Sequence, residues 1–395
     1  MTTLATPARK TAAIFLLMTM TVLGVFPLDV ILPSFPSMAT HFGTSVADIA
    51  LSVSLFSIGL SLSLLLVGPL SDNLGRKRLL MIGMTVAVIG SAGCAMADDF
   101  TTFLVFRVVQ AVGCGSFVLS QALVQDLFVG KEQERLRIAI VTAGGICISV
   151  SPLFGSWLQT WLDWRGSFQV FGVIGLVLVF KAWLLLESPS TAPSVRIPIL
   201  KAYRQVLSDR RFVGYWLISA LAFTCHFAFI VVSPIILMEQ LALTPYQFSL
   251  ALLLYGAAYV LGGMGAGWMN RRMEGHTQIV TGLRLIALAG VLMLVLHNVW
   301  GLSVITVMLP MILCTAGTTI TRPIATSRAM GLFPHSAGTS ASAGNVIIFV
   351  SGGLISGLVS QAGTQVMTVL PMTFLILSAI GMGLNALVQR PAHVS

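Results

Sequence analysis

Residues 68–78 read Gly-Pro-Leu-Ser-Asp-Asn-Leu-Gly-Arg-Lys-Arg and separate two apolar stretches of the chain, 46–67 and 78–97. Each stretch is long enough to cross a bilayer, because a membrane helix needs about 20 apolar residues. Gly75 permits a tight reversal of the chain, and three cations follow it directly. Basic residues gather in the cytoplasmic loops of membrane proteins. We therefore expect this segment to be a short cytoplasmic loop between two membrane helices.

The composition argues against a water-soluble globule. Of the 395 residues, 56% are hydrophobic and only 9% are charged, and the mean hydropathy is +0.94. A soluble domain carries roughly 25% charged residues because its surface must face water, so most of this surface must face lipid. The net charge of +9 does not indicate nucleic-acid binding, because the basic residues fall in short clusters between apolar runs. The five cysteines are scattered without metal-ligand spacing, so we expect neither a metal site nor disulfide bonds.

Outward from the loop, the chain divides into twelve apolar runs, which predict an all-α integral membrane protein. No A-x-A cleavage site follows the first run, so we expect it to remain as a membrane helix and not to be a signal peptide. The twelve predicted transmembrane helices are 12–38, 46–67, 78–97, 100–125, 136–159, 165–186, 212–238, 246–269, 277–297, 299–321, 337–360 and 366–388.

The basic residues predict the orientation of the chain. Twelve spans place both termini on one side, and eighteen Lys and Arg residues fall on that side, Arg322 and Arg328 among them. Arg165 alone falls in a loop on the other side. The loops on that side instead carry acids: Asp98, Asp99, Asp163 and Glu239. We therefore expect a multi-pass protein of the bacterial inner membrane with both termini in the cytoplasm.

The longest polar stretch, 188–210, divides the chain into two halves. It holds three prolines and has six predicted spans on each side. We predict an N-terminal six-helix half at 1–187, a cytoplasmic linker at 188–210 and a C-terminal six-helix half at 211–395, which is the arrangement of parallel repeats. A large insertion could fall midway by chance. Residues 267–272, after the eighth span, weakly repeat the glycine and basic residues of 68–78 and favour the repeat.

The loop at 68–78 resembles the signature loop of the major facilitator superfamily, G-x-L-a-D-r-x-G-r-k, in sequence and in position. The resemblance implies the twelve-helix fold of that superfamily and transport by alternating access. It also implies a conformational lock between this loop and the inner end of the fourth span, formed by Gly68, Asp72, Gly75, Arg76 and Asp126. A loop that only sets membrane orientation would explain the cations, but not the aspartate and glycines at these spacings. Asp126 could instead be a solvated helix end.

In the fourth span, residues 107–113 resemble the R-x-x-q-G-x-g element of the superfamily, with Ala111 in place of a glycine. Arg107 lies eight residues after Asp99, hence about 12 Å below the outer edge of the membrane. An arginine at this depth costs at least about 2.5 kcal/mol against lipid, so it must face a partner or a wet cavity unless it snorkels. We expect Arg107 and Gln110 to take part in proton or substrate handling.

The fifth span carries Gly144-Gly145 and then Ser-Pro-Leu-Phe-Gly-Ser at 151–156. This run resembles the antiporter motif of exporters in the superfamily, G-P-x-x-G-G, with serines at two of the glycine positions. The resemblance implies roles in that motif for Gly144, Pro152 and Gly155. Small residues and a proline make a bendable helix against which a neighbour can slide, although ordinary small-residue packing explains the same pattern.

The end of the first span, residues 26–36, resembles the D-m-y-L-P-x-x-P pattern of the bicyclomycin/chloramphenicol-resistance branch of drug:proton antiporters. Its acid, Asp29, lies amid apolar neighbours, and a buried acid in a membrane relieves its charge by taking up a proton. When Asp29 is ionised, it and Arg107 can offset each other. Asp29 could instead lie at the outer headgroups. His226, near the middle of the seventh span, is a further candidate for proton handling, or else a packing residue.

Together these resemblances imply proton-coupled efflux of small amphipathic molecules or drugs, with no enzymatic activity and no cofactor beyond the proton gradient. Asp29 is the one acid deep in the N-terminal spans, so we expect neutral or zwitterionic cargo in preference to dications. The expected partners are this cargo, protons and the lipid bilayer, without nucleic acid. We expect the protein to act as a monomer.

Other functions remain open on the sequence. A dedicated exporter or importer of one metabolite, such as a siderophore or a nucleoside, would carry the same motifs. An intramembrane enzyme or receptor would need a cluster of catalytic or metal-binding residues, and the sequence does not show one. A nucleotide-driven pump would need a G-x-x-x-x-G-K-[ST] loop, which is absent.

The predicted orientation can be tested with reporter fusions. An alkaline phosphatase fused near Asp163 should be active, because that loop is expected outside, whereas one fused within 188–210 should be inactive. Green fluorescent protein fusions at the same two sites should give the opposite result. The reversed pattern at both sites would contradict the twelve-span topology.

Overall fold

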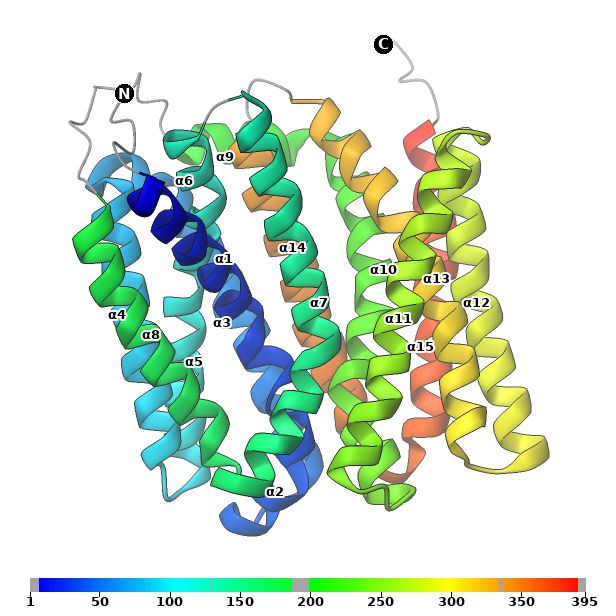
Figure 1. Ribbon diagram of the computed structural model, residues 1–395. Helices are drawn as coiled ribbons and strands as arrows, with labels where there is room; N and C mark the ends of the chain where they lie inside the picture. Colours follow the sequence, from blue (N-terminus) through cyan, green and yellow to red (C-terminus); the bar gives the residue numbers. More distant parts are fainter. Residues whose placement is uncertain (1–6, 129, 187–198, 334–336, 390–395) are drawn as a thin grey trace. The chain divides into compact units, whose positions relative to one another are not determined.

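The computed structural model describes residues 7–128, 130–186, 199–333 and 337–389 (Figure 1). Every regular element in these residues is helical. Eleven helical segments of this part of the chain are long and apolar enough to cross a membrane. The remaining predicted span, 136–159, falls inside a single 33-residue helix, Gly130–Leu162. The all-helical membrane fold predicted from the sequence is confirmed.

The helices form two compact units, the first made of Met1–Thr44 and Leu55–Arg196 and the second of Ser45–Ser54 and Ile197–Ser395. The elements of the first unit are α1 (Pro7–Asp29), η1 (Leu32–Ser34), α2 (Phe35–Phe42), α4 (Arg76–Met96), α5 (Phe100–Cys114), η2 (Gly115–Val118), α6 (Leu119–Leu127), α7 (Gly130–Leu162) and α8 (Arg165–Leu185). The elements of the second unit are α9 (Ile199–Ser208), α10 (Arg210–Pro234), the π-helical η3 (Ile235–Gln240), α11 (Pro245–Asn270), α12 (Gly275–Trp300), α13 (Val304–Gly331), α14 (Ala337–Ser360), η5 (Gly363–Gln365) and α15 (Val366–Gln389). The helix α3 (Val46–Leu74) begins in the second unit and continues in the first.

Large apolar side chains point outward along the helices. On α8, Val173 is 66% exposed and Leu176 is 62% exposed, and on α11, Leu254 and Leu261 are 68% and 67% exposed. Soluble proteins rarely leave such extended apolar faces in water. The backbone groups of these helices are bonded within each helix, which is what a lipid environment requires. The chain is a multi-pass membrane protein.

The first span is broken into three elements. The predicted single span 12–38 contains the end of α1 at Asp29, the short η1, and the start of α2. Prolines explain the break, because proline has no N–H for a helical hydrogen bond and is favoured at the first position of a new helix. Pro33 is the second residue of η1, and Pro36 is the second residue of α2. As a result, Asp29 is the last residue of α1 and does not lie inside a continuous helix.

Glycines let the helices of the first unit approach at main-chain distance. α4 packs on α5 and α8, and α1 packs on α7 and α8. A Cβ added at Gly90 of α4 would lie 2.4 Å from the main-chain nitrogen of Gln110. A Cβ added at Gly113 of α5 would lie 2.2 Å from the main-chain nitrogen of Ala87. These contacts agree with small-residue packing, the usual way in which membrane helices associate.

The signature loop forms the expected reversal. α3 ends at Leu74, Gly75 has a φ of 84°, and α4 begins at Arg76. A residue with a side chain is strained at this φ, so glycine is required at the turn. At the other end of α4, Asp99 begins α5 by accepting a hydrogen bond from the Thr102 main chain. The bonds from Thr102 hold the pKa of Asp99 below its ordinary value, so this cap is charged at neutral pH.

In the second unit, α10 packs against α13, α14 and α15, while α12 packs against α13 and α15. The tenth predicted span ended at 321, and this boundary is wrong. α13 continues through Pro323 to Gly331, so Arg322 lies inside the helix, about 14 Å from its end at 1.5 Å per residue. Membrane helices tolerate proline, and Pro323 leaves only the Thr319 carbonyl, four residues earlier, without its helical N–H donor.

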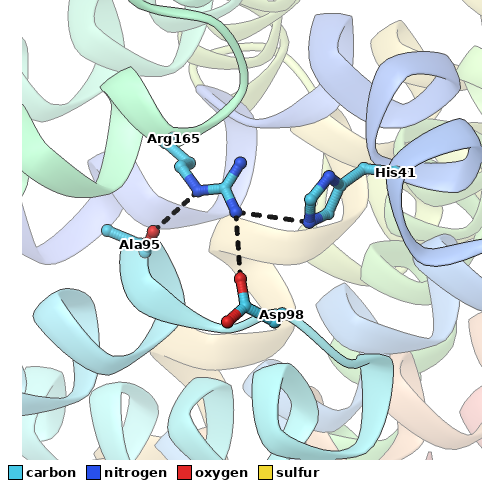
Figure 2. A network of polar contacts seen from close by, with 4 residues as sticks. All are labelled: His41, Ala95, Asp98 and Arg165. Atoms are coloured by element: carbon cyan, nitrogen blue, oxygen red, sulfur yellow. Dashed lines mark hydrogen bonds and ion pairs between the residues drawn. The ribbon is translucent and has the colours of Figure 1, made fainter.

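The Arg165 guanidinium contacts His41, Ala95 and Asp98 at one end of the first unit, as Figure 2 shows. Its Nε donates to the Ala95 carbonyl at 2.9 Å, and its terminal nitrogen lies 3.3 Å from His41 Nε2 and 3.6 Å from the Asp98 carboxylate. The guanidinium also lies 4.5 Å above the centre of the Trp164 ring. The start of α8 is thereby joined to α2 and to the turn between α4 and α5.

Replacing Arg165 by alanine should lower the free energy of unfolding by about 1–2 kcal/mol, because a charge-assisted hydrogen bond and a cation–π contact are lost. Asp98→Asn should have little effect, since the Asp98 side chain is 94% exposed and exposed ion pairs contribute little. Thermal unfolding of the purified protein in detergent would compare the two. A drop for Asp98→Asn as large as that for Arg165→Ala would contradict this ranking.

Candidate functional site

Arg107 of α5 is fully buried, with 0% of its surface exposed. Within the described part of the chain, no carboxylate lies within 4 Å of its guanidinium. One terminal nitrogen donates to Gln110 Oε1 at 2.6 Å, and the other donates to the Pro27 carbonyl of α1 at 3.0 Å. A buried charge must be compensated, and here a side-chain amide and a main-chain carbonyl do so.

The Pro27 carbonyl belongs to the last turn of α1, which ends at Asp29. The final four carbonyls of a helix lack partners within that helix and carry a partial negative charge, so a cation placed there is stabilising. Arg107 therefore caps the end of α1, two residues before the candidate proton carrier.

A chain of hydrogen bonds holds Arg107 in this position. Gln110 Nε2 donates to Ser91 Oγ at 3.1 Å, and Ser91 Oγ donates to the Phe168 carbonyl at 2.8 Å. The guanidinium carbon lies 4.4 Å from the centre of the Phe56 ring and 5.6 Å from that of Phe168. Aromatic faces attract a desolvated cation, so these rings add to the hydrogen bonds. The end of α1 is thus linked through α5 to α4 and α8.

Asp29 is 7% exposed. No hydrogen bond or ion pair reaches its carboxylate from any residue that the structure describes. The direct charge pairing with Arg107 suggested by the sequence is therefore not made in this structure, because Arg107 binds the main chain of α1 instead. A buried carboxylate without a cation on it has a high electrostatic free energy, and its place at the negative end of a helix raises that free energy further.

α7, which carries the antiporter-motif residues, lies in main-chain contact with α1 beside Asp29. A Cβ added at Gly155 would lie 2.0 Å from the carbonyl oxygen of Val30, so only glycine fits there. The rings of Phe26 and Phe154 lie 6.0 Å apart, and Cys147 Sγ lies 3.8 Å from the Val22 carbonyl oxygen. Any movement of α7 along α1 must therefore pass over the residues that flank Asp29.

His226 of α10 belongs to a cluster of aromatic side chains in the second unit. The Tyr255 hydroxyl of α11 is hydrogen-bonded to His226 Nδ1, and the two rings are stacked with centroids 5.1 Å apart. The Tyr259 ring lies 5.6 Å from the His226 ring. His226 is 9% exposed, so α11 holds this imidazole in one orientation within a mostly apolar setting.

Arg322 of α13 lies beside the same aromatic cluster, a position that the sequence analysis did not predict. Its guanidinium lies 4.8 Å above the ring of Phe223, whose centroid is 6.4 Å from that of His226. No described carboxylate lies within ion-pair distance of Arg322. The sequence analysis ended the tenth span at residue 321 and counted Arg322 among the cytoplasmic cations. The apolar pattern that continues after Pro323 was the signal that could have located it inside the helix.

The structure therefore gathers most of the candidate residues of the first unit around the end of α1: Asp29, Arg107, Gln110, Pro152 and Gly155 are on α1, α5 and α7. Gly75 and Arg76 lie at the α3–α4 turn, and His226 lies in the second unit. Four further candidate positions lie outside the described side chains: Gly68, Asp72, Asp126 and Gly144.

A family model described as Major Facilitator Superfamily matches residues 14–357. The MFS-type transporter YdgK of Bacillus subtilis (strain 168) is 29% identical over 381 residues, which cover 93% of this chain and 92% of that protein. A chloramphenicol resistance protein of Pseudomonas aeruginosa is 27% identical over 368 residues, 91% of this chain and 84% of that protein. The multidrug resistance protein MdtL of Vibrio parahaemolyticus is 24% identical over 385 residues, 96% of each chain.

Solved structures share the fold. A bacterial homologue of the human lysosomal transporter Spinster, in an inward-facing and occupied conformation, superposes with a TM-score of 0.77 at 14% identity, covering 98% of both chains. A D-xylose–proton symporter superposes with a TM-score of 0.73 at 15% identity, covering 94% of this chain and 97% of that one. At these identities the similarity concerns the fold alone.

Gly155→Ala should force α7 away from α1 and lower the free energy of unfolding by about 1–3 kcal/mol, because the added methyl group overlaps the Val30 carbonyl. Gly172→Ala on α8 is the matched control, since no atom lies within 4 Å of its added Cβ. Thermal unfolding in detergent would measure both variants. Equal midpoints for Gly155→Ala and wild type would contradict the tight contact between α1 and α7.

Proposed function

Since this chain belongs to the Major Facilitator Superfamily, we propose that it exports small amphipathic molecules in exchange for protons that move inward. Its relatives include a chloramphenicol resistance protein and multidrug resistance proteins, which supports drug-like cargo. The proton gradient supplies the driving force without a bound cofactor. The transporter acts as a monomer in the bacterial inner membrane, with both termini in the cytoplasm.

The observation that carries this proposal is the burial of the Asp29 carboxyl without a described cation partner. Its carboxyl is buried at the end of α1, and Arg107, the nearby cation of α5, is bonded to the α1 main chain. Taking up a proton removes the cost of a buried charge at the negative end of a helix. A carboxyl in this position is suited to carry a proton across the interior of a transporter.

The α1–α7 contact offers a way for that proton to affect movement. Gly155 of α7 rests on the carbonyl of Val30, the residue that follows Asp29. A change of charge on Asp29 changes the electrostatic free energy of the α1 end against which α7 packs. The proton would thereby shift the balance between two positions of α7, and this balance is the coupling step of the proposed exchange.

Charge also selects the cargo. Arg107 in the first unit and Arg322 in the second are cations without a described carboxylate partner. A transporter with two such charges in its helices repels dications and accepts neutral or zwitterionic molecules. The rings around His226 offer stacking surfaces for an aromatic or amphipathic compound. A dedicated exporter or importer of a single metabolite is the alternative, and a cargo panel separates the two.

Asp29→Asn should abolish proton-coupled export, because an amide cannot gain or lose the proton, while cargo binding is retained. Everted vesicles loaded with a pH-sensitive dye would report proton release when neutral, zwitterionic and dicationic compounds are added. Wild type should respond to the first two classes, and Asp29→Asn should give the signal of vesicles without the transporter. Asp98→Asn, which changes an exposed acid, is the matched control and should behave as wild type.

Two results would overturn the assignment. Export of cargo against its gradient by Asp29→Asn at the wild-type rate would place the coupling at another residue. Strong export of dications by wild type would contradict the proposed selection by charge.

A further inference from the structure

At one end of the second unit, α10 and α12 begin and α13 and α15 finish (Figure 1). Residues at these helix ends line a pocket of about 510 Å³. Its volume is in the range of small-molecule and headgroup sites. The residues that line it are Arg211, Tyr215, Glu274, His276, Arg328, Leu332, Val388 and Gln389.

The lining is rich in cations. Arg211 lies in the first turn of α10, Arg328 lies in the last turn of α13, and Glu274 is the one acid among the described residues of the lining. Among the described residues, neither guanidinium group has a carboxylate within 4 Å, and the nearby Asp209 carboxylate instead accepts from the Arg211 main-chain N–H at 2.8 Å. Both arginines are exposed to the pocket side of the unit and to solvent, so their charges are available to a ligand.

Arg328 is already oriented by the wall of the pocket. It donates to the Tyr215 hydroxyl at 3.2 Å, and its guanidinium carbon lies 5.9 Å from the centre of that ring. It also passes close to Gly275, where an added Cβ would lie 3.0 Å from one of its nitrogens. A guanidinium held in place loses less freedom when it binds an anion.

His276 is oriented as well. Asn385 is 1% exposed, and its amide nitrogen lies 2.7 Å from His276 Nδ1. When the Asn385 N–H donates to Nδ1, the proton of a neutral imidazole resides on Nε2, which can then donate to a ligand. The first turn of α12 adds to this, because its N-cap residue, Glu274, makes no side-chain hydrogen bond to the helix N–H groups.

We propose that this pocket binds an anionic phosphate group, with the guanidinium groups of Arg211 and Arg328 and the imidazole of His276 as donors. Guanidinium groups match the oxygen geometry of phosphate and form short, strong hydrogen bonds to it. The pocket lies at helix ends and includes the apolar Leu332 and Val388, which favours the headgroup of an anionic phospholipid over a soluble phosphate.

The positive charge at this end of the unit favours an anionic phospholipid as the ligand. The helix ends and turns here also carry Lys201, Arg204, Arg210, Arg271 and Arg272. The described residues at the opposite end of α10 and α11 carry no Lys or Arg, but do carry Glu239. Such basic ends face the cytoplasmic leaflet, where anionic lipids attract them. A headgroup held between α10, α12, α13 and α15 would stabilise the ends of these helices by mass action.

The test is native mass spectrometry of the purified full-length protein, titrated with phosphatidylglycerol, phosphatidylcholine or inorganic phosphate. Wild type should retain phosphatidylglycerol in preference to phosphatidylcholine. The double variant Arg211→Gln/Arg328→Gln should bind phosphatidylglycerol about tenfold more weakly, because two charge-assisted bonds are lost. The control Arg204→Gln/Arg271→Gln removes the same charge outside the pocket lining and should bind as wild type does.

Tyr215→Phe keeps every charge but removes the hydroxyl that positions Arg328, and it should weaken binding about threefold. Attraction by net surface charge alone would leave this variant unaffected. Displacement of phosphatidylglycerol by millimolar inorganic phosphate would support the phosphate site and identify a soluble ligand as its source. Equal binding by wild type and the Arg211→Gln/Arg328→Gln variant, or equal losses in the two double variants, would overturn the proposal.

Discussion

Arg107 brings a positive charge into the interior of the first unit, where lipid and protein offer it no water. The protein must therefore supply acceptors for the guanidinium N–H groups. These acceptors are Gln110 Oε1 and the Pro27 carbonyl in the last turn of α1. This requirement ties α5 to the end of α1. Through Gln110 and Ser91 it also determines how α4 and α8 pack around them.

The position of Asp29 follows from that bond. α1 stops at Asp29, ahead of the prolines at the starts of η1 and α2, and a helix end in an apolar interior needs a donor for its carbonyls. Arg107 supplies this donor, so it does not neutralise the Asp29 carboxylate. The acid is thus held in place by its own helix and remains chemically available. α7 rests against the next residue through Gly155, which places the α1–α7 contact at the candidate proton carrier.

In the second unit, aromatic rings stabilise a cation that has no described carboxylate partner. Arg322 lies within α13 and stacks on Phe223, while His226 is bonded to Tyr255. Aromatic faces stabilise a cation without bringing in an opposite charge, so Phe223 supports the Arg322 guanidinium without a carboxylate. At the end of the same unit the arginines have a different environment. Arg211 and Arg328 stand at helix ends around a pocket, where a mobile anion can reach them.

The sequence by itself determined the properties that depend on local composition. Long apolar runs can be stable only as membrane helices, so the all-helical fold followed from hydropathy, and Gly75 marked the loop between α3 and α4. The depth of Arg107 in its span showed that it needed a partner. The bicyclomycin/chloramphenicol-resistance pattern around Asp29 singled out the acid.

Only the tertiary structure decided which groups meet. Arg107 and Pro27 are 80 residues apart in the chain, and Asn385 and His276 are 109 apart. Gly155 likewise meets Val30 from a distant helix, and the pocket forms only where the ends of four helices converge. Hydropathy is a sum over neighbouring residues and carries no information about helix rotation or register. Partner choice depends on both, because a hydrogen bond or a main-chain contact needs its atoms within a few tenths of an ångström of one geometry.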